Sequence, residues 1–362
     1  AILIILCLGA ALFSASAFAL EDPSFEARRV LLADMDSGKV LFAHNEHEQV
    51  TPASLTKIVT CLVAVEAIEN GEVNLDDEVE AQPGCRDGMD EMSSTSGIMP
   101  GEKMPLEELL YCAMVQSANE ACNIIAHHVS GSVGEFVTRM NERARELGAV
   151  ESNFVNTNGL TADGHYTTAN DLFIITTEAM KHPLFYDLCT TIYHTVPATN
   201  FNEERNLTNS NALVNMDSIY GSGYLYQGAA GVKTGYTKAA GYCLVSTVDR
   251  NDMHLLLVVM GSNGPLNTGN DNAEYGNFVD SINIYDWAME NFSVYRIVEA
   301  ADVAAAAKVR LARGNGTVSL HADKDIEVVL PNDLDNYKAE LITTVYEDAL
   351  VAPIEAGDIL GE

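Results

Sequence analysis

The segment TPASLTKIVT contains a serine and a lysine at a spacing that could support nucleophilic chemistry. Ser54 and Lys57 are three residues apart at the start of an apolar run, and residues i and i+3 of a helix share a face. A hydroxyl at a helix N-terminus lies in a positive field that favours an alkoxide, and a neutral amine nearby can accept its proton. The pair alone is a weak signal, because S-x-x-K occurs about once by chance in a chain of this length.

Two further stretches strengthen the signal. MVQSANEA places Ser117 two residues before Asn119, and GVKTGYTKAAGY contains Lys233, Thr234 and Gly235 just before an apolar strand. A K-T-G tripeptide is expected only on the order of once in several thousand positions. S-x-x-K, S-x-N and K-T-G, in this order, are the motifs of class A β-lactamases and penicillin-binding proteins. Together they predict acyl transfer through a serine, a reaction for which we expect no metal and no cofactor.

Beyond these motifs, the chain resembles the low-molecular-mass penicillin-binding proteins that act as serine-type D-alanyl-D-alanine carboxypeptidases, peptidase family S11. The resemblance covers about residues 24–292 and includes the segments DMDSGKVLFAHN, PASLTK, LLYCAMVQSANEAC, NGLTADGHYTTANDL and GVKTGYTKAAGYCLV. It implies a multi-domain α+β protein with a β-lactamase/transpeptidase-like peptidase domain, in which helices and a helical lobe flank an antiparallel sheet. A small β-rich domain would follow over residues 293–362.

The resemblance also implies a reaction, the removal of the terminal D-Ala from peptidoglycan stem peptides that end in D-Ala-D-Ala, and acylation by β-lactam antibiotics such as penicillin. Ser54 would attack the carbonyl of the penultimate D-Ala, and Lys57 would act as its base. Ser117 would relay a proton to the leaving D-Ala, and Asn119 would bind the substrate peptide or Lys57. Lys233 would supply positive charge that keeps Lys57 neutral.

The K-T-G strand would hold the rest of the substrate. Lys233 and Thr234 would contact the terminal carboxylate, and Gly235 would let the strand lie close to the substrate backbone. The backbone N–H groups of Ser54 and Tyr236 would form the oxyanion hole. Some relatives carry His where this chain has Tyr236. The loops ALVNMDSIYGSGYLYQGAAG and GSNGPLNTGNDNAEYGN lack the arginine or lysine expected near the carboxylate, so the group that replaces it is open.

The pattern of apolar residues predicts the elements that position these motifs. RRVLLADMDSGKVLFAHN reads as two strands joined at residues 36–38, and SLTKIVTCLVAVEAIENG as a buried helix with Ser54 or Thr51 as N-cap and a stop at residues 70–71. GYCLVSTVDRNDMHLLLVVMGS reads as two strands, and NFVDSINIYDWAMENF as an amphipathic helix. Strands at both ends imply an antiparallel sheet whose first and last strands pair.

Two more helical blocks are expected between these ends. One begins with Pro105 at its first helical position and runs on through SANEACNIIAHHV, and the other begins at the capping box of Ser132 and Glu135 and ends at Gly148. The stretch from there to the K-T-G motif reads as polar and irregular. Beyond residue 295, the alternating segments TVSLHA, DIEVVLP and AELITTVYED predict short strands.

The N-terminus reads as a partial signal peptide over residues 1–19. An apolar run ends in Ala17 and Ala19, which match a small-x-small cleavage site, although the initiator Met and the basic region of a full leader are missing. A membrane anchor is the alternative, but the apolar stretch is short for a span. We therefore expect an exported, extracytoplasmic protein that is truncated at both ends, with a membrane tether only in a longer C-terminus.

Composition limits the partners. The chain has 52 acidic and 20 basic residues, a net charge of −32, so its surface should repel phosphates and we expect no nucleic-acid partner. The six cysteines after the leader match no zinc or CxxC spacing, and most lie in apolar runs, which predicts buried free thiols.

Two other functions compete with a carboxypeptidase. A β-lactamase needs a glutamate that activates the deacylating water, usually in E-x-x-L-N, and the nearest candidate is Glu204 in ERNLT, close to K-T-G and far from S-x-N. An inactive wall-binding module should have lost one of the three motifs, and all three are intact. His165, in the segment NGLTADGHYTTANDL, is assigned a structural role because the sequence shows no pairing partner for it.

Overall fold

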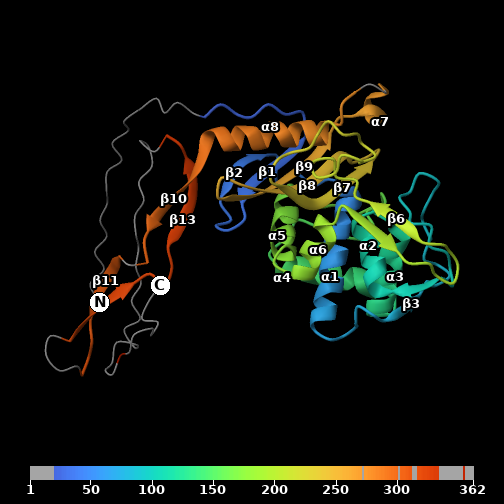
Figure 1. Ribbon diagram of the computed structural model, residues 1–362, viewed down its shortest axis with the longest axis horizontal. Helices are drawn as coiled ribbons and strands as arrows, with labels where there is room; N and C mark the ends of the chain where they lie inside the picture. The colour runs from blue at the N-terminus through green and yellow to red at the C-terminus, as the bar shows by residue number, and fades with distance from the viewer. Residues whose placement is uncertain (1–19, 271–272, 301, 312–315, 334–353, 355–362) are drawn as a thin grey trace. The chain divides into compact units, whose positions relative to one another are not determined.

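The computed structural model of this 362-residue chain describes residues 20–270, 273–300, 302–311 and 316–333, together with residue 354 (Figure 1). The chain divides into two compact units. One is Ser24–Tyr295, and the described residues from Arg296 onwards belong to the other. The expected leader, residues 1–19, lies outside the described residues.

A five-stranded antiparallel sheet forms the centre of the first unit. Its order is β2-β1-β9-β8-β7, so the first strands of the unit pair with the last ones, as the sequence predicts. The strands are β1 (Arg29–Asp34), β2 (Val40–His44), β7 (Ala229–Thr237), β8 (Gly241–Arg250) and β9 (Met253–Ser262). All six residues of β1 are buried, because helices cover both faces of the sheet.

Two layers of helices enclose the sheet. Helix α8 (Gly276–Asn291) covers one face of β8 and β9, and the helical lobe lies on the opposite side (Figure 1). The lobe contains α1 (Thr56–Glu69), α2 (Leu106–Met114), α3 (Asn119–Ser130), α4 (Val133–Glu146), α5 (Ala169–Ala179) and α6 (Pro183–Thr190). Eleven of the 14 residues of α1 are buried, which makes this helix the axis of the lobe. The lysine of the S-x-x-K motif therefore lies inside the core.

The start of α1 differs from the sequence prediction. A short 3-10 turn, η1 (Ala53–Leu55), precedes the helix, and the N-cap residue is Leu55, without a side-chain capping bond. The prediction of Ser54 or Thr51 as N-cap is wrong, because Ser54 lies inside η1 and its hydroxyl contacts Lys57 instead. The predicted stop is confirmed, since the helix ends at Glu69.

Of the other predicted helix starts, that of α4 is confirmed and that of α2 is wrong by one position. The capping box of α4 is confirmed, because the Ser132 hydroxyl accepts from the Glu135 N–H at 3.1 Å. Pro105 is the N-cap of α2 and not its first helical residue, because it still pairs in the short strand β4 (Lys103–Pro105) with β3 (Glu78–Glu80). The sequence had not separated α2 from α3.

The stretch between Gly148 and the K-T-G motif is more regular than expected. It contains α5, α6 and a hairpin of β5 (Tyr193–Val196) and β6 (Arg205–Thr208). Thr168 caps α5 by accepting from the Asp171 N–H at 3.1 Å. The T-x-x-D spacing is a recognised helix start, and it is the signal that could have predicted α5.

The described residues of the second unit lie mostly in short strands, the first of which begins in the first unit and continues past Tyr295. β10 (Phe292–Val298) pairs with β13 (Ile326–Pro331), and β11 (Val303–Lys308) pairs with β12 (Thr317–His321). The strands expected in TVSLHA and DIEVVLP are confirmed, whereas AELITTVYED lies outside the described residues. The boundary expected between residues 292 and 293 stays a prediction.

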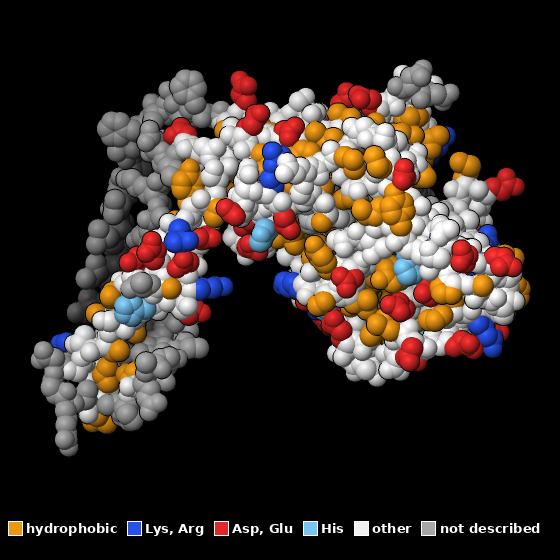
Figure 2. Space-filling model, in the orientation of Figure 1, with side chains coloured by type: hydrophobic (Ala, Val, Ile, Leu, Met, Phe, Trp, Pro, Cys, Tyr) orange, Lys and Arg blue, Asp and Glu red, His pale blue; other side chains and the backbone are white. Residues whose placement is uncertain are grey.

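The surface charge and the burial of the cysteines can both be compared with what the sequence predicts. Acidic side chains are spread over the face drawn in Figure 2. The six described cysteines are buried free thiols, as predicted, and they are Cys61, Cys85, Cys112, Cys122, Cys189 and Cys243. Among the helices that the structure describes, none combines the length and the apolar character that crossing a membrane requires.

Candidate active site

Ser54 lies in η1, where the helical lobe meets β7. Ala53, just before it, has a φ of 51°, in the left-handed region that costs an alanine about 1–2 kcal/mol. Two glycines face the peptide between Ala53 and Ser54. A Cβ on Gly159 would lie 1.8 Å from the Ala53 carbonyl oxygen, and one on Gly235 would lie 3.3 Å from the Ser54 nitrogen. Close backbone approach at both glycines therefore holds the strained turn.

Lys57 is fully buried and points at Ser54. Its Nζ lies 2.9 Å from Ser54 Oγ, 2.7 Å from Asn119 Oδ1 and 2.8 Å from the Asn158 carbonyl oxygen. The two carbonyl oxygens can only accept, so they take two N–H groups. A neutral amine has two N–H groups and one lone pair, and that lone pair would then face the Ser54 hydroxyl.

Burial and neighbouring charges act on the pKa values of both lysines in the site. Burial lowers the pKa of Lys57, although nearby thiols and Glu120 act in the opposite direction. Burial and, secondly, the charge of Lys57 lower the pKa of Lys233 to about 7. The two lysines therefore share a site that disfavours two positive charges. That Lys233 keeps Lys57 neutral stays a prediction.

The S-x-N motif reaches the same site from the start of α3. Asn119 is the first residue of this helix, and its backbone N–H donates to the Ser94 carbonyl oxygen at 2.9 Å. Ser117 has a φ of 62° and is buried. A left-handed non-glycine residue is costly and is often found at functional sites. The Asn119 contact to Lys57 joins this motif to S-x-x-K.

The K-T-G motif lies on β7, the last strand in the sheet order. One edge of β7 has no neighbouring strand among the described residues, so its backbone groups can pair with an extended peptide. Lys233 and Thr234 are buried, and Thr234 Oγ1 lies 2.5 Å from Ser210 Oγ. The ring of Tyr236 packs against Tyr242 with centroids 4.5 Å apart. That the backbone N–H of Tyr236 belongs to the oxyanion hole stays a prediction.

Several residues of this site were missed from the sequence. Asn158 acts through its carbonyl oxygen, which every residue has, and Gly159 acts by having no side chain. Ser210 stands in the loop before K-T-G, in the segment TNSN, where no motif marks it. The Asn158 and Gly159 positions fall in the segment NGLTADGHYTTANDL, so the resemblance pointed to the right loop without giving these roles.

His165 has the pairing partner that the sequence did not show. Its Nε2 lies 2.9 Å from Thr56 Oγ1, and its Nδ1 accepts from the Val155 N–H at 3.0 Å. Burial lowers the pKa of His165 to about 4. The ring is therefore neutral near pH 7. The structural role was predicted from the lack of a pairing partner, and that reason does not hold, because Thr56 and the Val155 N–H are partners.

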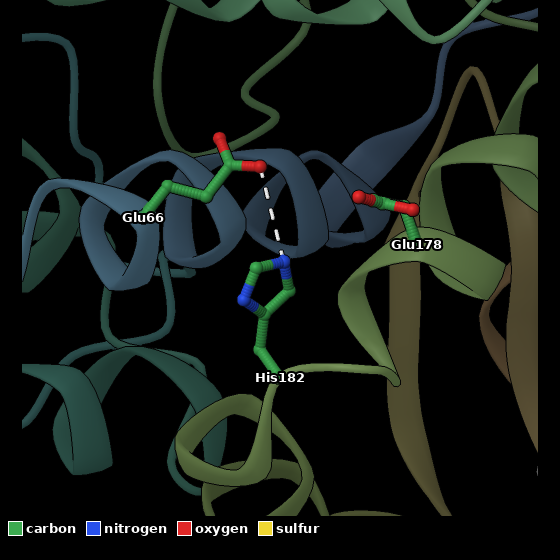
Figure 3. A group of neighbouring side chains, drawn as sticks. All are labelled: Glu66, Glu178 and His182. Atoms are coloured by element: carbon green, nitrogen blue, oxygen red, sulfur yellow. Dashed lines mark ion pairs between the residues drawn. The ribbon is translucent and has the colours of Figure 1, made fainter. Parts of the chain in front are cut away.

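A separate group has donor types that metals use. Glu66, Glu178 and His182 each offer an atom within 4.8 Å of the others, and their side chains converge (Figure 3). Arg143 donates to Glu66 at 2.8 Å and to Glu178 at 3.2 Å, and His182 Nδ1 lies 2.7 Å from Glu69 Oε2. Because Arg143 pairs with both Glu66 and Glu178 and His182 pairs with Glu69, these contacts explain the group, and we assign no metal to it.

Three motifs thus meet around one serine on an α+β, transpeptidase-like fold, and comparison with known proteins agrees. A sequence model of the peptidase S11 family, D-alanyl-D-alanine carboxypeptidase, matches residues 16–264, so the chain belongs to that family. D-alanyl-D-alanine carboxypeptidase DacF of Bacillus subtilis is similar, with 30% identity over 361 residues, which cover 96% of this chain and 85% of DacF.

Solved structures show the same architecture. Penicillin binding protein 5 from Haemophilus influenzae is 26% identical with a TM-score of 0.76, and the match covers 95% of this chain and 93% of that protein. The peptidoglycan synthesis regulatory factor PBP3 from Streptococcus pneumoniae has a TM-score of 0.80 at 24% identity, and the match covers 93% of this chain and 91% of that protein. Both confirm the fold predicted from the sequence.

Proposed function

We propose that this chain is a serine-type D-Ala-D-Ala carboxypeptidase that removes the terminal D-Ala from peptidoglycan stem peptides through an acyl-enzyme on Ser54. One observation carries the proposal. A fully buried lysine amine, with two carbonyl oxygens to take its N–H groups, lies 2.9 Å from the Ser54 hydroxyl. Membership of the S11 family supports the reaction class.

Acylation begins with proton transfer from Ser54 Oγ to the neutral Nζ of Lys57, while Oγ attacks the carbonyl carbon of the penultimate D-Ala. The carbonyl oxygen takes up negative charge and is stabilised by the backbone N–H groups of Ser54 and Tyr236. The close approach of Gly235 to the Ser54 nitrogen supports this pairing, since it brings the two chain segments together.

Collapse of the tetrahedral intermediate breaks the bond to the terminal D-Ala. The leaving amine needs a proton, which Lys57 now carries and which Ser117 relays to it. Asn119 holds Lys57 in place and binds the substrate peptide. Water then attacks the ester while Lys57 takes a proton from it, and Lys57 returns that proton to Ser54 Oγ as the ester bond breaks, which releases the shortened stem peptide and restores the free serine and the neutral amine.

The terminal carboxylate of the substrate would lie at the K-T-G strand. Lys233 supplies positive charge when protonated, and a carboxylate bound beside it would raise its pKa from about 7. Thr234 and Ser210 form a pair of hydroxyls next to this lysine. We assign this hydroxyl pair the hydrogen-bonding part that the missing arginine would otherwise play.

Inhibitor binding and location follow from the same proposal. Relatives with this fold are named penicillin-binding proteins, and we propose that penicillin acylates Ser54 in this chain. Peptidoglycan lies outside the cytoplasmic membrane, so the proposed substrate requires export, in line with the leader expected in residues 1–19.

A β-lactamase remains the second candidate, and one observation counts against it. Glu204, the candidate for activating the deacylating water, is exposed and stands immediately before β6, whereas Lys57, Asn119 and Asn158 are buried. Retention of all three motifs around one serine disfavours an inactive wall-binding module.

One experiment separates the three functions. The purified protein is incubated with a fluorescent penicillin and, separately, with a peptide that ends in D-Ala-D-Ala, and both the lifetime of the adduct and the release of D-Ala are measured. A carboxypeptidase gives a long-lived adduct and catalytic D-Ala release. A β-lactamase gives a short-lived adduct and hydrolysed penicillin, and a binding module gives neither product.

A further inference from the structure

A chain of hydrogen bonds runs from His165 to the peptide just before the nucleophile. The Val155 N–H donates to His165 Nδ1 at 3.0 Å, and His165 Nε2 lies 2.9 Å from Thr56 Oγ1. Thr56 Oγ1 in turn donates to the Ala53 carbonyl oxygen at 2.9 Å. His165 and Thr56 are both buried, so water does not compete for these bonds.

The direction of every bond in this chain is determined. A backbone N–H can only donate, so Nδ1 of His165 accepts and Nε2 carries the proton of the neutral ring. Nε2 therefore donates to Thr56 Oγ1, and the only proton of that hydroxyl is left for the Ala53 carbonyl oxygen. Each hydrogen-bond donor in this series therefore fixes the orientation of the next one.

The last acceptor belongs to the peptide that supplies the oxyanion hole. The carbonyl oxygen of Ala53 and the N–H of Ser54 are the two ends of one planar unit. A donor that fixes the carbonyl end also fixes the direction in which the Ser54 N–H points. Donation to the carbonyl also polarises the peptide and strengthens the N–H as a donor. This peptide needs support, because Ala53 holds a left-handed φ of 51°.

We infer that His165 is a positioning residue that aims the Ser54 N–H of the oxyanion hole by way of the Thr56 hydroxyl. The inference rests on the proposed acyl transfer. It differs from a general packing role in its consequence: loss of the donor at Nε2 slows the acylation step itself and leaves initial binding of the acyl donor unchanged.

The expected loss of acylation rate depends on which hydrogen bond the Ala53 carbonyl oxygen keeps. The backbone N–H of Thr56 also donates to the Ala53 carbonyl oxygen, so the peptide keeps one bond when the hydroxyl is released. Complete loss of an oxyanion-hole donor costs about 100-fold to 1,000-fold in rate. A misdirected donor should cost less, and we expect about a tenfold slower acylation.

Two substitutions of His165 separate the two ring nitrogens. His165→Gln keeps an N–H donor near the place of Nε2 and loses the acceptor for Val155. His165→Asn keeps an acceptor near the place of Nδ1 and loses the donor to Thr56. Each variant loses one hydrogen bond, so both should lose similar thermal stability. His194→Gln is the control, because His194 pairs with Glu108 at 2.7 Å in another part of the lobe.

Stopped-flow acylation with a fluorescent penicillin gives the rate constant of the chemical step separately from the binding constant. We expect His165→Asn to slow this step about tenfold with unchanged binding, and His165→Gln and His194→Gln to stay within about twofold of the wild type. Thr56→Val should slow it at least as much as His165→Asn, and the double variant Thr56→Val/His165→Asn should be no slower than Thr56→Val alone. Equal rates for the Asn and Gln variants, or additive losses in the double variant, would overturn the inference.

A readout without turnover keeps this test independent of the proposed function. If the wild-type protein forms no adduct, the proposed function fails, and the Ser54 amide resonance in an NMR spectrum then decides the present inference. We expect that resonance to shift in His165→Asn and to stay near the wild-type position in His165→Gln. An unmoved resonance in His165→Asn would contradict the inference.

Discussion

Replacement of Gly159 by alanine should slow acylation of Ser54 by about 100-fold in a protein that still folds. The new Cβ would lie 1.8 Å from the Ala53 carbonyl oxygen, 2.3 Å from its carbonyl carbon and 2.9 Å from the Ser54 nitrogen. Side-chain Cβ atoms do not approach other heavy atoms within 3.0 Å, so the Ala53–Ser54 peptide must move by about 1.2 Å. The neighbours on that side are backbone atoms, which cannot swing aside as a side chain does.

The expected loss of acylation rate follows from this displacement of the Ala53–Ser54 peptide. The peptide that moves carries both the nucleophile and one donor of the proposed oxyanion hole. A displacement of about 1 Å at reacting groups can cost on the order of 100-fold, or about 2.7 kcal/mol of activation free energy. The positive φ of 90° at Gly159 adds a stability loss of about 1–2 kcal/mol for alanine, which is independent of the clash.

Gly131→Ala is the matched control. Gly131 also has a positive φ, 75°, at the C-cap of α3, but a Cβ there meets nothing within 4 Å. The Gly131→Ala variant should lose stability only because of the positive φ, and its Ser54 should be acylated at the wild-type rate. The assay is the acylation rate with a fluorescent penicillin, alongside thermal unfolding of each variant. Wild-type acylation in folded Gly159→Ala would refute the reasoning that this peptide is held by close approach of Gly159.

The remaining predictions concern the lysines, His165 and the first unit. Lys57→Ala should abolish acylation, because Lys57 supplies the amine hydrogen-bonded to the Ser54 hydroxyl and the part of the chain that the structure describes shows no second one there. Lys233→Ala should mainly weaken use of the anionic substrate, so equal losses for a free-acid peptide and for its ester would contradict this role. The pKa of His165 is about 4 in the folded protein and 6.5 when unperturbed, so the unfolded chain binds this proton first as the pH falls. The free energy of unfolding that His165 contributes is complete above pH 6.5 and is lost as the pH falls towards 4, by up to about 3 kcal/mol. The free energy of unfolding of His165→Gln should therefore fall less than that of the wild type between pH 6.5 and pH 4. A protein of residues 24–295 should unfold cooperatively and release D-Ala at close to the full-chain rate, because every proposed site group lies within that unit. Cooperative unfolding with most turnover lost would show that the residues beyond 295 contribute to the site.

The parts of the fold that were predicted are those with a local pattern. The hairpin of β1 and β2, the buried helix around Lys57 and the capping box at Ser132 each depend on residues close in sequence. The pairing of β1 with β9 followed from the order of strands and helices. The start of α1 was misread because Ser54, a good capping residue by type, makes its contact with Lys57 in three dimensions.

The parts of the site that were missed act through the backbone or through distant partners. The Asn158 carbonyl oxygen and the bare Cα of Gly159 have no side-chain signature. His165 is 109 positions from Thr56, so no spacing rule links the two. Ser210 and Thr234 come together only because the loop before β7 folds back on that strand. The motifs therefore indicated the chemistry, and the groups that aim it needed the structure.

The most direct test of the account is the site of the covalent adduct. The wild-type protein and Ser54→Ala are incubated with penicillin, digested and mapped by mass spectrometry, while release of D-Ala from a D-Ala-D-Ala peptide is followed on the same preparations. We predict a single penicilloyl group on Ser54 and D-Ala release by the wild type, with neither in Ser54→Ala. An adduct on another residue, or D-Ala release by folded Ser54→Ala, would contradict the assignment of Ser54 as the nucleophile.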